Sequence, residues 1–399
     1  MNQPTPRVQL LRSLIESRRW LVILALLGTL LRFALIAKTP PEHFLDEVIY
    51  DSIGVSVSHG LGFKDTTGFF AYRAPGQGAF IGLIFTLVGH RPYAVEIAGA
   101  MMLAGLPFLC SRMGRILGLS PLAANLGATL AAFHPGITYA STTLYPTVLT
   151  TITLTLAIWL CWESIERDRA GWAIAAGLAC GLAGAATTTF APFAFFAAVI
   201  IAFRRRFSMA VLVALFGLVP ALAWMIRNEI VLHDFTLATN GGYNLELGAN
   251  DQATPRSGNW IDPQLDWSVG EVRFDRNLRD QAKTWIRAHP ARYAELSILR
   301  ALAVFDSVGK PRTQGVNSGR LAQIVGWALL PVVLLGVAGL ILRCRHPIAW
   351  LTAAALGLVV LSSALTLAKP RFRLPIDPML CVFAMSTAVS IKHRSLPSG

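Results

Sequence analysis

The sequence predicts an all-α polytopic membrane protein with about ten transmembrane helices. Of its 399 residues, 54% are hydrophobic and 14% are charged, whereas a soluble globular domain has about 25% charged residues. Apolar runs of roughly 20 residues, the length that a helix needs to cross the hydrocarbon, recur along the chain. Charged residues gather between these runs, so the chain alternates between spans and loops.

The composition also argues against two other classes of protein. The formal net charge of +13 is typical of a nucleic-acid binder, but such proteins gather their cations on one soluble face. Here the cations flank apolar runs, where they orient a membrane protein. The five cysteines lie within or beside apolar segments and show no CxxC or CxxH spacing. We therefore expect no nucleic-acid partner, no disulfide framework and no cysteine metal site.

Ten apolar segments are candidate spans, and one more is too short to cross the membrane. The candidate spans are residues 20–37, 93–111, 121–137, 146–162, 172–187, 189–203, 207–226, 321–342, 347–368 and 374–391. The short segment, residues 79–89, is bounded by Gly78 and Gly89. We expect it to form a helix that lies on or dips into the outer face of the membrane.

The region 172–203 is interpreted as two short spans and not as one long span. Three consecutive threonines at 187–189, followed by Pro192, interrupt its apolar pattern. Arginines precede the region at 167 and 169 and follow it at 204–206. Both clusters are cytoplasmic only if the chain goes out and returns.

With ten spans, both termini are cytoplasmic and the chain divides into three regions. Residues 1–226 form an N-terminal transmembrane region whose first outer loop is 38–92, residues 227–320 form an extracytoplasmic cap, and residues 321–399 supply the last helices. Most loop arginines then face inward, as the positive-inside rule requires. One short outer loop, 369–373, breaks this pattern with three cations. We expect a multi-pass protein of the plasma (bacterial inner) membrane, with its active site on the extracytoplasmic side.

The cap is expected to contain a turn followed by two helices. The glycines of Asn240-Gly241-Gly242-Tyr243-Asn244 permit positive φ, which is typical of a turn. Apolar residues then recur at helical spacing over 272–289, and Pro290 ends that helix or starts the next. A region of this size and content indicates a small cap that rests on the bundle, without an independent catalytic domain.

The first outer loop carries two adjacent carboxylates, Asp46 and Glu47, in the otherwise apolar stretch 44–50. They are either solvated charges of a loop near the membrane, or a general base beside a residue that orients it or a cation. A carboxylate at an apolar boundary loses solvation, which raises its pKa and makes it a better proton acceptor. Because adjacent side chains diverge in direction, we expect only Asp46 to face a substrate.

Arg73 is the first candidate ligand for a lipid phosphate. It lies in Tyr72-Arg73-Ala74-Pro75-Gly76, directly before the short outer segment. A guanidinium group can hold phosphate oxygens with two parallel hydrogen bonds. The alternative is an interfacial arginine that reaches ordinary lipid headgroups.

Lys369, Arg371 and Arg373 lie in the outer loop that breaks the charge rule. If the loop is extended, alternation around Phe372 places both arginines on one side. Together with Arg73 they could then bind a departing phosphate and stabilise the charge that develops on it. The alternative is an error in the number of spans.

The remaining ionisable residues give weaker signals. Arg32 and Glu96 lie within spans near their ends, where reaching to the interface or pairing is expected. His134, before Pro135, is expected to be a packing residue, and the histidines show no metal-binding spacing. The sequence contains no G-x-G-x-x-G, GxxxxGK[ST] or GxSxG motif, so neither nucleotide binding nor serine hydrolysis is supported.

Taken in order, several motifs resemble the GT-C class of membrane glycosyltransferases, in particular the group of protein O-mannosyltransferases and aminoarabinose transferases (family 39 and its bacterial relatives). The likeness runs from about residue 20 to 391. The motifs are Asp46-Glu47 with Tyr50, Tyr72-Arg73-Ala74-Pro75-Gly76, Trp224-Met225-Ile226-Arg227-Asn228 leading into Thr239-Asn240-Gly241-Gly242-Tyr243-Asn244, Arg287-Ala288-His289-Pro290-Ala291-Arg292-Tyr293, and Arg371-Phe372-Arg373-Leu374-Pro375.

The resemblance implies a GT-C-type bundle with an outer layer of juxtamembrane helices, and transfer of a sugar from a polyprenyl-phosphate carrier to an extracytoplasmic acceptor. Asp46 would be the catalytic base, with Glu47 beside it. The residues that would contact the donor are Tyr72, Arg73, Asn240, Tyr243, Lys369, Arg371 and Arg373. The sugar, a hexose or a pentose, and the acceptor, a lipid, a glycan or a protein, stay open.

One departure from the family concerns a metal ion. Several members have a second acid in the loop before the fourth span, where this chain has Thr143-Leu144-Tyr145-Pro146. Tyr145 supplies no carboxylate, so no cofactor is certain and a divalent cation stays an open alternative. The mechanism that we expect is inverting displacement, in which Asp46 takes the proton of an acceptor hydroxyl and the lipid phosphate leaves.

Two rival functions come from other classes of protein. The first is a membrane transporter or a flippase for a lipid-linked sugar, although the inverted repeats typical of such folds are not visible in the sequence. The second is a non-catalytic membrane subunit that binds a partner through residues 227–320. Transport without a new glycosidic bond would favour the first, and tolerance of charge removal at Asp46 and Arg73 would favour the second.

Overall fold

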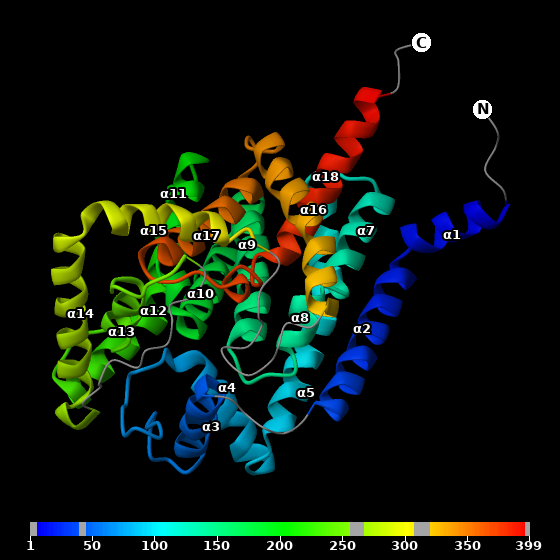
Figure 1. Ribbon diagram of the computed structural model, residues 1–399. Coiled ribbons are helices and arrows are strands. Elements are labelled where there is room, and N and C mark those ends of the chain that lie inside the picture. Colours follow the sequence, from blue (N-terminus) through cyan, green and yellow to red (C-terminus); the bar gives the residue numbers. More distant parts are fainter. Residues whose placement is uncertain (1–5, 40–44, 256–266, 307–319, 396–399) are drawn as a thin grey trace.

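The computed structural model describes residues 6–39, 45–255, 267–306 and 320–395. Within these ranges all regular structure is helical, which confirms the all-α prediction (Figure 1). Residues 307–319, at the end of the expected cap, and Phe44, at the start of the acidic stretch, lie outside the described ranges.

In chain order, with η marking a 3₁₀ helix, the described helices are α1 (Pro6–Glu16), α2 (Arg18–Lys38), α3 (Leu45–Ser58), α4 (Pro75–Val88), α5 (Pro92–Met102), η1 (Leu103–Gly105), α6 (Leu106–Ile116), α7 (Pro121–Ala132), α8 (Pro135–Ala140), α9 (Thr147–Arg167), α10 (Ala170–Ala186), η2 (Thr188–Phe190), α11 (Phe193–Phe203), α12 (Phe207–Leu232), α13 (Gly241–Gly248), η3 (Trp267–Val269), α14 (Glu271–Ala288), α15 (Pro290–Ala303), α16 (Arg320–Leu342), α17 (Pro347–Leu365), η4 (Pro370–Phe372) and α18 (Asp377–Ser395).

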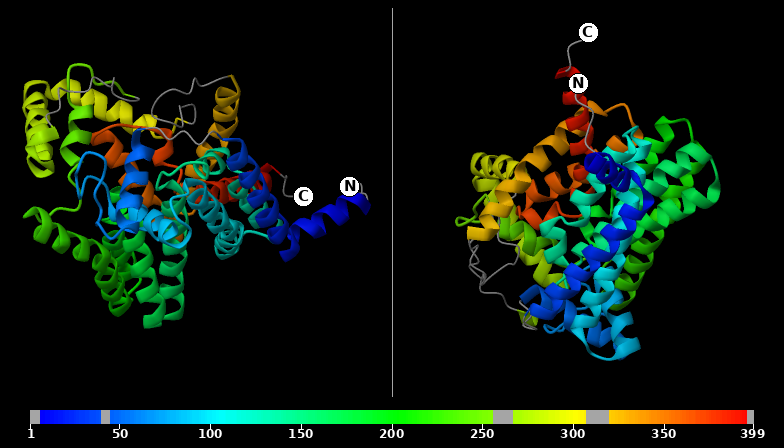
Figure 2. Two further views of the ribbon diagram at one scale, coloured as in Figure 1. Left: turned by 90° about the horizontal axis from the view of Figure 1, so that it is seen from below. Right: turned by 90° about the vertical axis from the view of Figure 1, so that its right-hand side faces the viewer.

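The described helices confirm a polytopic membrane protein. Six helical stretches among the described residues, one of them made of α5, η1 and α6, are long and apolar enough to cross a membrane, and they correspond to expected spans. These helices are Arg18–Lys38, Pro92–Ile116, Thr147–Arg167, Phe207–Leu232, Ile324–Leu342 and Pro347–Leu365. Shorter apolar helices cover the expected spans near 172–203 and at the C-terminal end. The first helix, α1, projects away from the bundle, and the far end of α18 lies on the same side of the molecule (Figures 1 and 2).

Two of the interrupted segments have identifiable causes. The division of 172–203 is confirmed, because α10 ends at Ala186 and α11 begins at Phe193, with a 3₁₀ turn between them. The expected single span at 121–137 is instead two helices, α7 and α8. They divide at His134, because Pro135 has no backbone N–H with which to continue the hydrogen bonds of α7. His134 then caps α8, since its Nδ1 accepts a hydrogen bond from the Ile137 backbone N–H.

The expected first outer loop is partly helical. Asp46 and Glu47 lie in the first turn of α3, where negative charge is favourable at a helix N-terminus. The short outer apolar segment forms α4, as expected. The two helices pack side by side below the bundle in Figure 1. The acidic pair therefore has a fixed orientation, which a loop would not give it.

The cap differs from its prediction at the double glycine. Residues 240–244 do not form a positive-φ turn, because Gly241 starts the short helix α13. Close approach explains the glycines instead. A Cβ atom on Gly242 would lie 1.9 Å from the backbone oxygen of Asp275 in α14, and one on Gly248 would lie 2.0 Å from that of Thr366 after α17. The two glycines let α13 fit between α14 and the segment that follows α17.

The other cap helices follow the sequence pattern. The apolar face of α14 buries Phe274, Leu278 and Ala282, and α15 begins at Pro290 as expected. A small hydrophobic cluster, the cap cluster, joins this face to the loop before α4. Its buried members are Phe69, Tyr72, Tyr243, Leu247, Phe274, Leu278 and Leu367. The cap is thereby packed against the same segments that carry the candidate site residues.

We predict that Gly242→Ala destabilises the cap, because the added Cβ atom collides with the backbone of α14. Overpacking of this kind typically costs about 1–3 kcal/mol. The measurement is thermal unfolding of the purified protein in detergent. Gly357→Ala in α17 is the matched control, since its added Cβ atom meets no heavy atom within 4 Å. Unfolding of the Gly242→Ala protein at the wild-type temperature would contradict this packing.

A second prediction concerns orientation in the membrane. Cys344, between α16 and α17, is the exposed member of five free cysteines. The charge pattern predicts that it faces the cytoplasm, so a membrane-impermeant maleimide should label it only in opened cells. An Arg91→Cys, Cys344→Ser protein should be labelled in intact cells, because Arg91 is exposed between α4 and α5. The opposite labelling pattern would show that the chain has the inverse topology.

Candidate active site

The residues singled out in the sequence meet around a partly enclosed cavity of about 200 Å³. Its wall is formed by α3, the loop before α4, the facing ends of α9, α10 and α17, helix α13, and η4. The lining residues are Asp46, Tyr50, Arg73, Ala74, Tyr145, Pro146, Thr147, Ala186, Thr187, Thr188, Thr189, Phe190, Asn240, Tyr243, Asn244, Leu247, Val359, Ser362, Ser363, Thr366, Leu367, Lys369, Arg371, Phe372 and Pro375.

Asp46 is held between two arginines from distant parts of the chain. Its Oδ1 accepts a hydrogen bond from Arg73 at 2.6 Å, and its Oδ2 accepts one from Arg371 at 3.0 Å. The side chains of all three residues are less than one-fifth exposed. Each carboxylate oxygen therefore has its own cationic donor.

Asp46 and Glu47 diverge, as expected from adjacent positions. Successive residues of a helix are turned by about 100°, so Asp46 shares a face with Tyr50 one turn later. Both of these residues line the cavity. Glu47 is fully buried and is not among the lining residues. The helix thus presents one carboxylate to the cavity and keeps the other inside the protein.

Aromatic rings fix the guanidinium groups. The guanidinium carbon of Arg73 lies 5.0 Å from the ring centre of Tyr72 and 5.7 Å from that of Tyr50. That of Arg371 lies 4.2 Å from the ring centre of Tyr145. Contacts at these distances attract a cation to the face of the ring. Tyr145, which supplies no carboxylate, therefore supports a cation at this position.

Tyr72 itself is buried and does not line the cavity. Its ring packs in the cap cluster, 6.3 Å from the ring of Tyr243. Tyr243 and Asn240 both line the cavity, at the start of α13. The structure therefore brings these two predicted contacts to the cavity wall and places Tyr72 behind it, against Arg73.

The loop after α17 separates its cations. It is not extended, because residues 370–372 form η4. Lys369 and Arg371 line the cavity, but Arg373 turns away into the protein. Arg373 donates to Asp377 at 2.7 Å and to the Val304 backbone oxygen at 2.7 Å. The two arginines do not share a face, and Arg373 instead anchors the loop to α18 and to the end of α15.

The charge environment reverses the expected shift of the Asp46 pKa. Burial alone would raise this pKa, but attraction to Arg73 and Arg371 outweighs burial and lowers the pKa to about 2. The prediction of a raised pKa considered only desolvation and was wrong. Burial and the neighbouring Arg371 lower the pKa of Lys369 to about 8. The cavity is strongly electropositive, and its carboxylate is a weak base while the arginines hold it.

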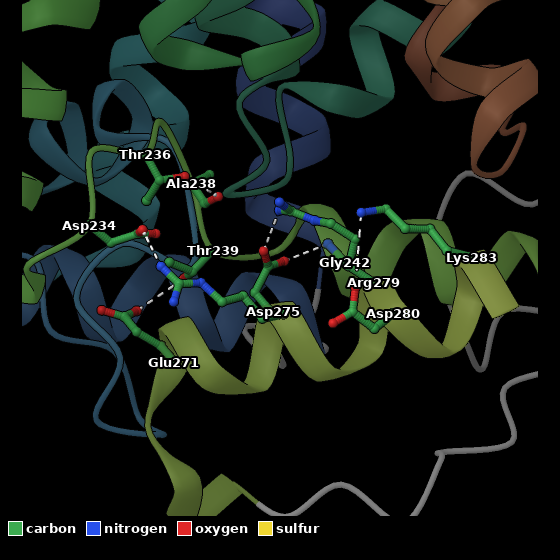
Figure 3. Close-up of polar contacts among 11 residues, drawn as sticks. Asp234, Thr236, Ala238, Thr239, Gly242, Glu271, Asp275, Arg279, Asp280 and Lys283 are labelled. Atoms are coloured by element: carbon green, nitrogen blue, oxygen red, sulfur yellow. Dashed lines mark hydrogen bonds and ion pairs between the residues drawn. The ribbon is translucent and has the colours of Figure 1, made fainter.

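The cap holds the loop that carries Arg73. Glu271, at the start of α14, accepts hydrogen bonds from the backbone N–H groups of Phe70 and Ala71 and from the hydroxyl of Thr239. Asp275, one turn later, accepts from the Gly242 N–H and from Arg279. Figure 3 shows these carboxylates on the side of α14 that faces Thr239 and Gly242. One face of α14 thus binds both the Arg73 loop and the start of α13.

Sequence reasoning missed the hydroxyl groups of the cavity. Thr187, Thr188 and Thr189 were noticed only as a break in a span, and Ser362 and Ser363 were not noticed. The sequence did carry a signal for them. The serine pair lies near the end of an apolar span and the threonine triplet lies between two spans, so both are expected at a similar depth in the membrane. Only the fold shows that both groups line one cavity.

The remaining ionisable residues lie outside the cavity lining. Arg32 is buried and donates to the Ala132 backbone oxygen at 2.6 Å, and Glu96 is buried in α5. His134 is buried 3.4 Å from Asp377, the partner of Arg373. Among the described residues, no three His, Cys, Asp or Glu side chains come together as a potential metal site. The two oxygens of Asp46 instead bind guanidinium groups.

Fold and site together define a polytopic membrane protein with an electropositive cavity. Comparisons with protein-family models and with curated proteins found no match. The chain is similar to two crystal structures of ArnT from Cupriavidus metallidurans, one bound to undecaprenyl phosphate and one in the apo state. The first is 14% identical with a TM-score of 0.49, covering 93% of this chain and 78% of that one. The second is 13% identical with a TM-score of 0.45, covering 95% and 81%.

Proposed function

We propose that the protein is a membrane glycosyltransferase that moves a sugar from a polyprenyl-phosphate donor to an extracytoplasmic acceptor. One observation carries the proposal. A single carboxylate lies between two guanidinium groups in a partly enclosed cavity at the ends of apolar helices. This arrangement offers a proton acceptor beside two cations that can bind a phosphate. The acceptor is a lipid, a glycan or a protein.

The reaction that fits these residues is a direct displacement with inversion. The acceptor oxygen attacks the anomeric carbon, and its proton passes to the Asp46 carboxylate. The bond between the anomeric carbon and the phosphate oxygen breaks, and its electron pair stays on the lipid phosphate. Arg73 and Arg371 stabilise the charge that develops on this leaving group. A phosphate held by two cations departs without a proton, so no general acid is required.

The ion pairs that Asp46 forms with Arg73 and Arg371 weaken it as a base until the donor binds. A carboxylate with a pKa of about 2 is a poor general base near neutral pH. A phosphate group that enters the cavity competes for Arg73 and Arg371 and adds a second negative charge beside Asp46. Both changes raise the pKa of Asp46, since an opposite charge is lost and a like charge is gained. Asp46 then becomes an effective base only when the donor is bound.

In this mechanism the arginines neutralise the charge of the phosphate, so the reaction does not require a metal ion. Lys369, which also lines the cavity, adds a third cation next to Arg371. Asn240 and Tyr243 supply hydrogen-bonding groups from α13. Arg373 and Tyr72 act through their neighbours, because they support Arg371 and Arg73 from behind the wall.

The first prediction from this mechanism separates catalysis from binding. Asp46→Asn should lower transfer from a polyprenyl-phosphate sugar by about 10²- to 10⁴-fold, the usual contribution of a general base. Binding of the donor should be as tight as in the wild type or tighter, because the arginines no longer have a competing carboxylate. Both quantities are measured with the protein in nanodiscs.

Asp51→Asn is the matched control for this experiment. Asp51 lies on the same helix but pairs with His90 at 3.0 Å and does not line the cavity, so transfer should persist. Retained transfer in the Asp46→Asn protein would remove Asp46 as the base. Movement of the lipid-linked sugar across the membrane without a new glycosidic bond would instead favour a flippase.

The second prediction concerns pH. Lys369 is charged below its pKa of about 8 and loses its charge as pH rises through that value. Donor affinity should therefore fall by about tenfold between pH 7 and 9, the usual worth of a hydrogen bond to a charged group. The donor is a phosphodiester whose own charge is constant in this range. Lys369→Arg should abolish the fall, because arginine stays charged. An identical pH profile in both proteins would exclude Lys369 from phosphate binding.

A further inference from the structure

Part of the cavity wall is uncharged and rich in hydroxyl groups. We call this part the hydroxyl face. Its members come from the segment 187–189 after α10 and from the end of α17, which packs against η2. They are Thr187, Thr188, Thr189, Ser362, Ser363 and Thr366. The charged lining residues come from other segments, α3, the loop before α4, and the loop after α17.

Most hydroxyl groups of this face have partners within the protein. Thr187 exchanges a hydrogen bond with Thr150 at 2.8 Å, and Thr366 donates to the Ser362 backbone oxygen at 2.8 Å. Ser363 is different. Its side chain is 1% exposed, and its Oγ has no hydrogen-bond partner among the described residues.

A buried hydroxyl group without a partner is unfavourable, and native proteins rarely retain one without a reason. Ser363 borders the cavity, so a polar group bound there can supply the partner. Thr188 is half-buried in the same lining and also carries a hydroxyl group. The face therefore offers hydrogen bonds that suit the hydroxyl groups of a sugar, and it offers no charge.

The charges of the cavity restrict the kind of sugar. Among the described lining residues are three cations, Arg73, Lys369 and Arg371, and one carboxylate, Asp46. Positive charge is in excess even after a phosphodiester with one negative charge has bound. An ammonium group on the sugar would meet repulsion from these cations, and the hydroxyl face holds no carboxylate to receive it. A sugar carboxylate would in turn find no cation on that face.

Building on the proposed function, we propose that the hydroxyl face is the sugar subsite and that it takes an uncharged sugar whose hydroxyl groups bind Ser363 and Thr188. The phosphate then lies at Arg73 and Arg371, and the sugar extends from it toward α10 and α17. This orientation places the anomeric carbon between the two groups of lining residues, within reach of an acceptor oxygen that Asp46 activates.

The test compares two lipid probes of equal charge. Polyprenyl phosphate esterified with a neutral hexose carries both phosphate and sugar, whereas polyprenyl methyl phosphate carries only the phosphodiester. Affinities are measured for the wild type in nanodiscs and for Ser363→Ala and Thr188→Val. Each variant should weaken binding of the hexose probe by about three- to tenfold, the range of one uncharged hydrogen bond. Binding of the methyl probe should stay unchanged.

The methyl probe also reports whether each variant is folded. Ser164→Ala is the matched control, because Ser164 is a fully buried serine of α9 that does not line the cavity. It should leave both affinities unchanged. Equal weakening for both probes, or no weakening for either, would overturn the subsite. A third probe with an aminohexose should bind the wild type more weakly than the neutral one, and tighter binding would overturn the charge argument.

The two proposals fail in different ways. If the wild type binds neither the hexose probe nor the methyl probe, the polyprenyl-phosphate function is wrong and the sugar subsite falls with it. A different result would leave the function standing and show that the subsite alone is wrong. In that result the wild type binds the methyl probe and transfers sugar, but Ser363→Ala and Thr188→Val change the affinities for both probes equally or not at all.

Discussion

The candidate site depends on a carboxylate that two arginines share. Arg73 lies 27 residues after Asp46 in the sequence and Arg371 lies 325 residues after it, yet both donate to its oxygens. Buried charges are tolerated only when they are paired and hydrogen-bonded. One carboxylate cannot neutralise two guanidinium groups and the nearby Lys369, so the cavity keeps an excess of positive charge. An anion that enters the cavity replaces the solvation that these cations lose on burial. This is a strong physical reason to propose a phosphate ligand.

Each arginine has its own support, and the supports explain the shape of the protein. On the Arg73 side, Glu271 of the cap holds the backbone of residues 70–71, and Arg227 at the end of α12 donates to the Phe70 oxygen. On the Arg371 side, Arg373 ties its loop to Asp377 of α18 and to the end of α15. The cap, the long helix α12 and the last helix therefore converge on two guanidinium groups.

What the sequence could predict was set by local rules. Span length, the break at residues 187–189 and the helices of the cap follow from apolar periodicity and from charge, which are properties of neighbouring residues. The pKa of Asp46 could not be predicted in this way, because its direction depends on Arg73, 27 residues away, and on Arg371, 325 residues away. The prediction at Gly242 failed for the same reason. This glycine is required by the close approach of α14 and not by the conformation of a turn.

The loop after α17 shows how tertiary structure resolves an ambiguity that the sequence left open. Three cations on the outer side conflict with the positive-inside rule, and the sequence allowed either a functional cluster or a miscounted span. The structure assigns the cations to two places. Lys369 and Arg371 line the cavity, whereas Arg373 forms a buried ion pair with Asp377. Because Arg371 pairs with Asp46 and Arg373 pairs with Asp377, while Lys369 lines the cavity, the cluster is better explained by the charges of the cavity than by membrane orientation.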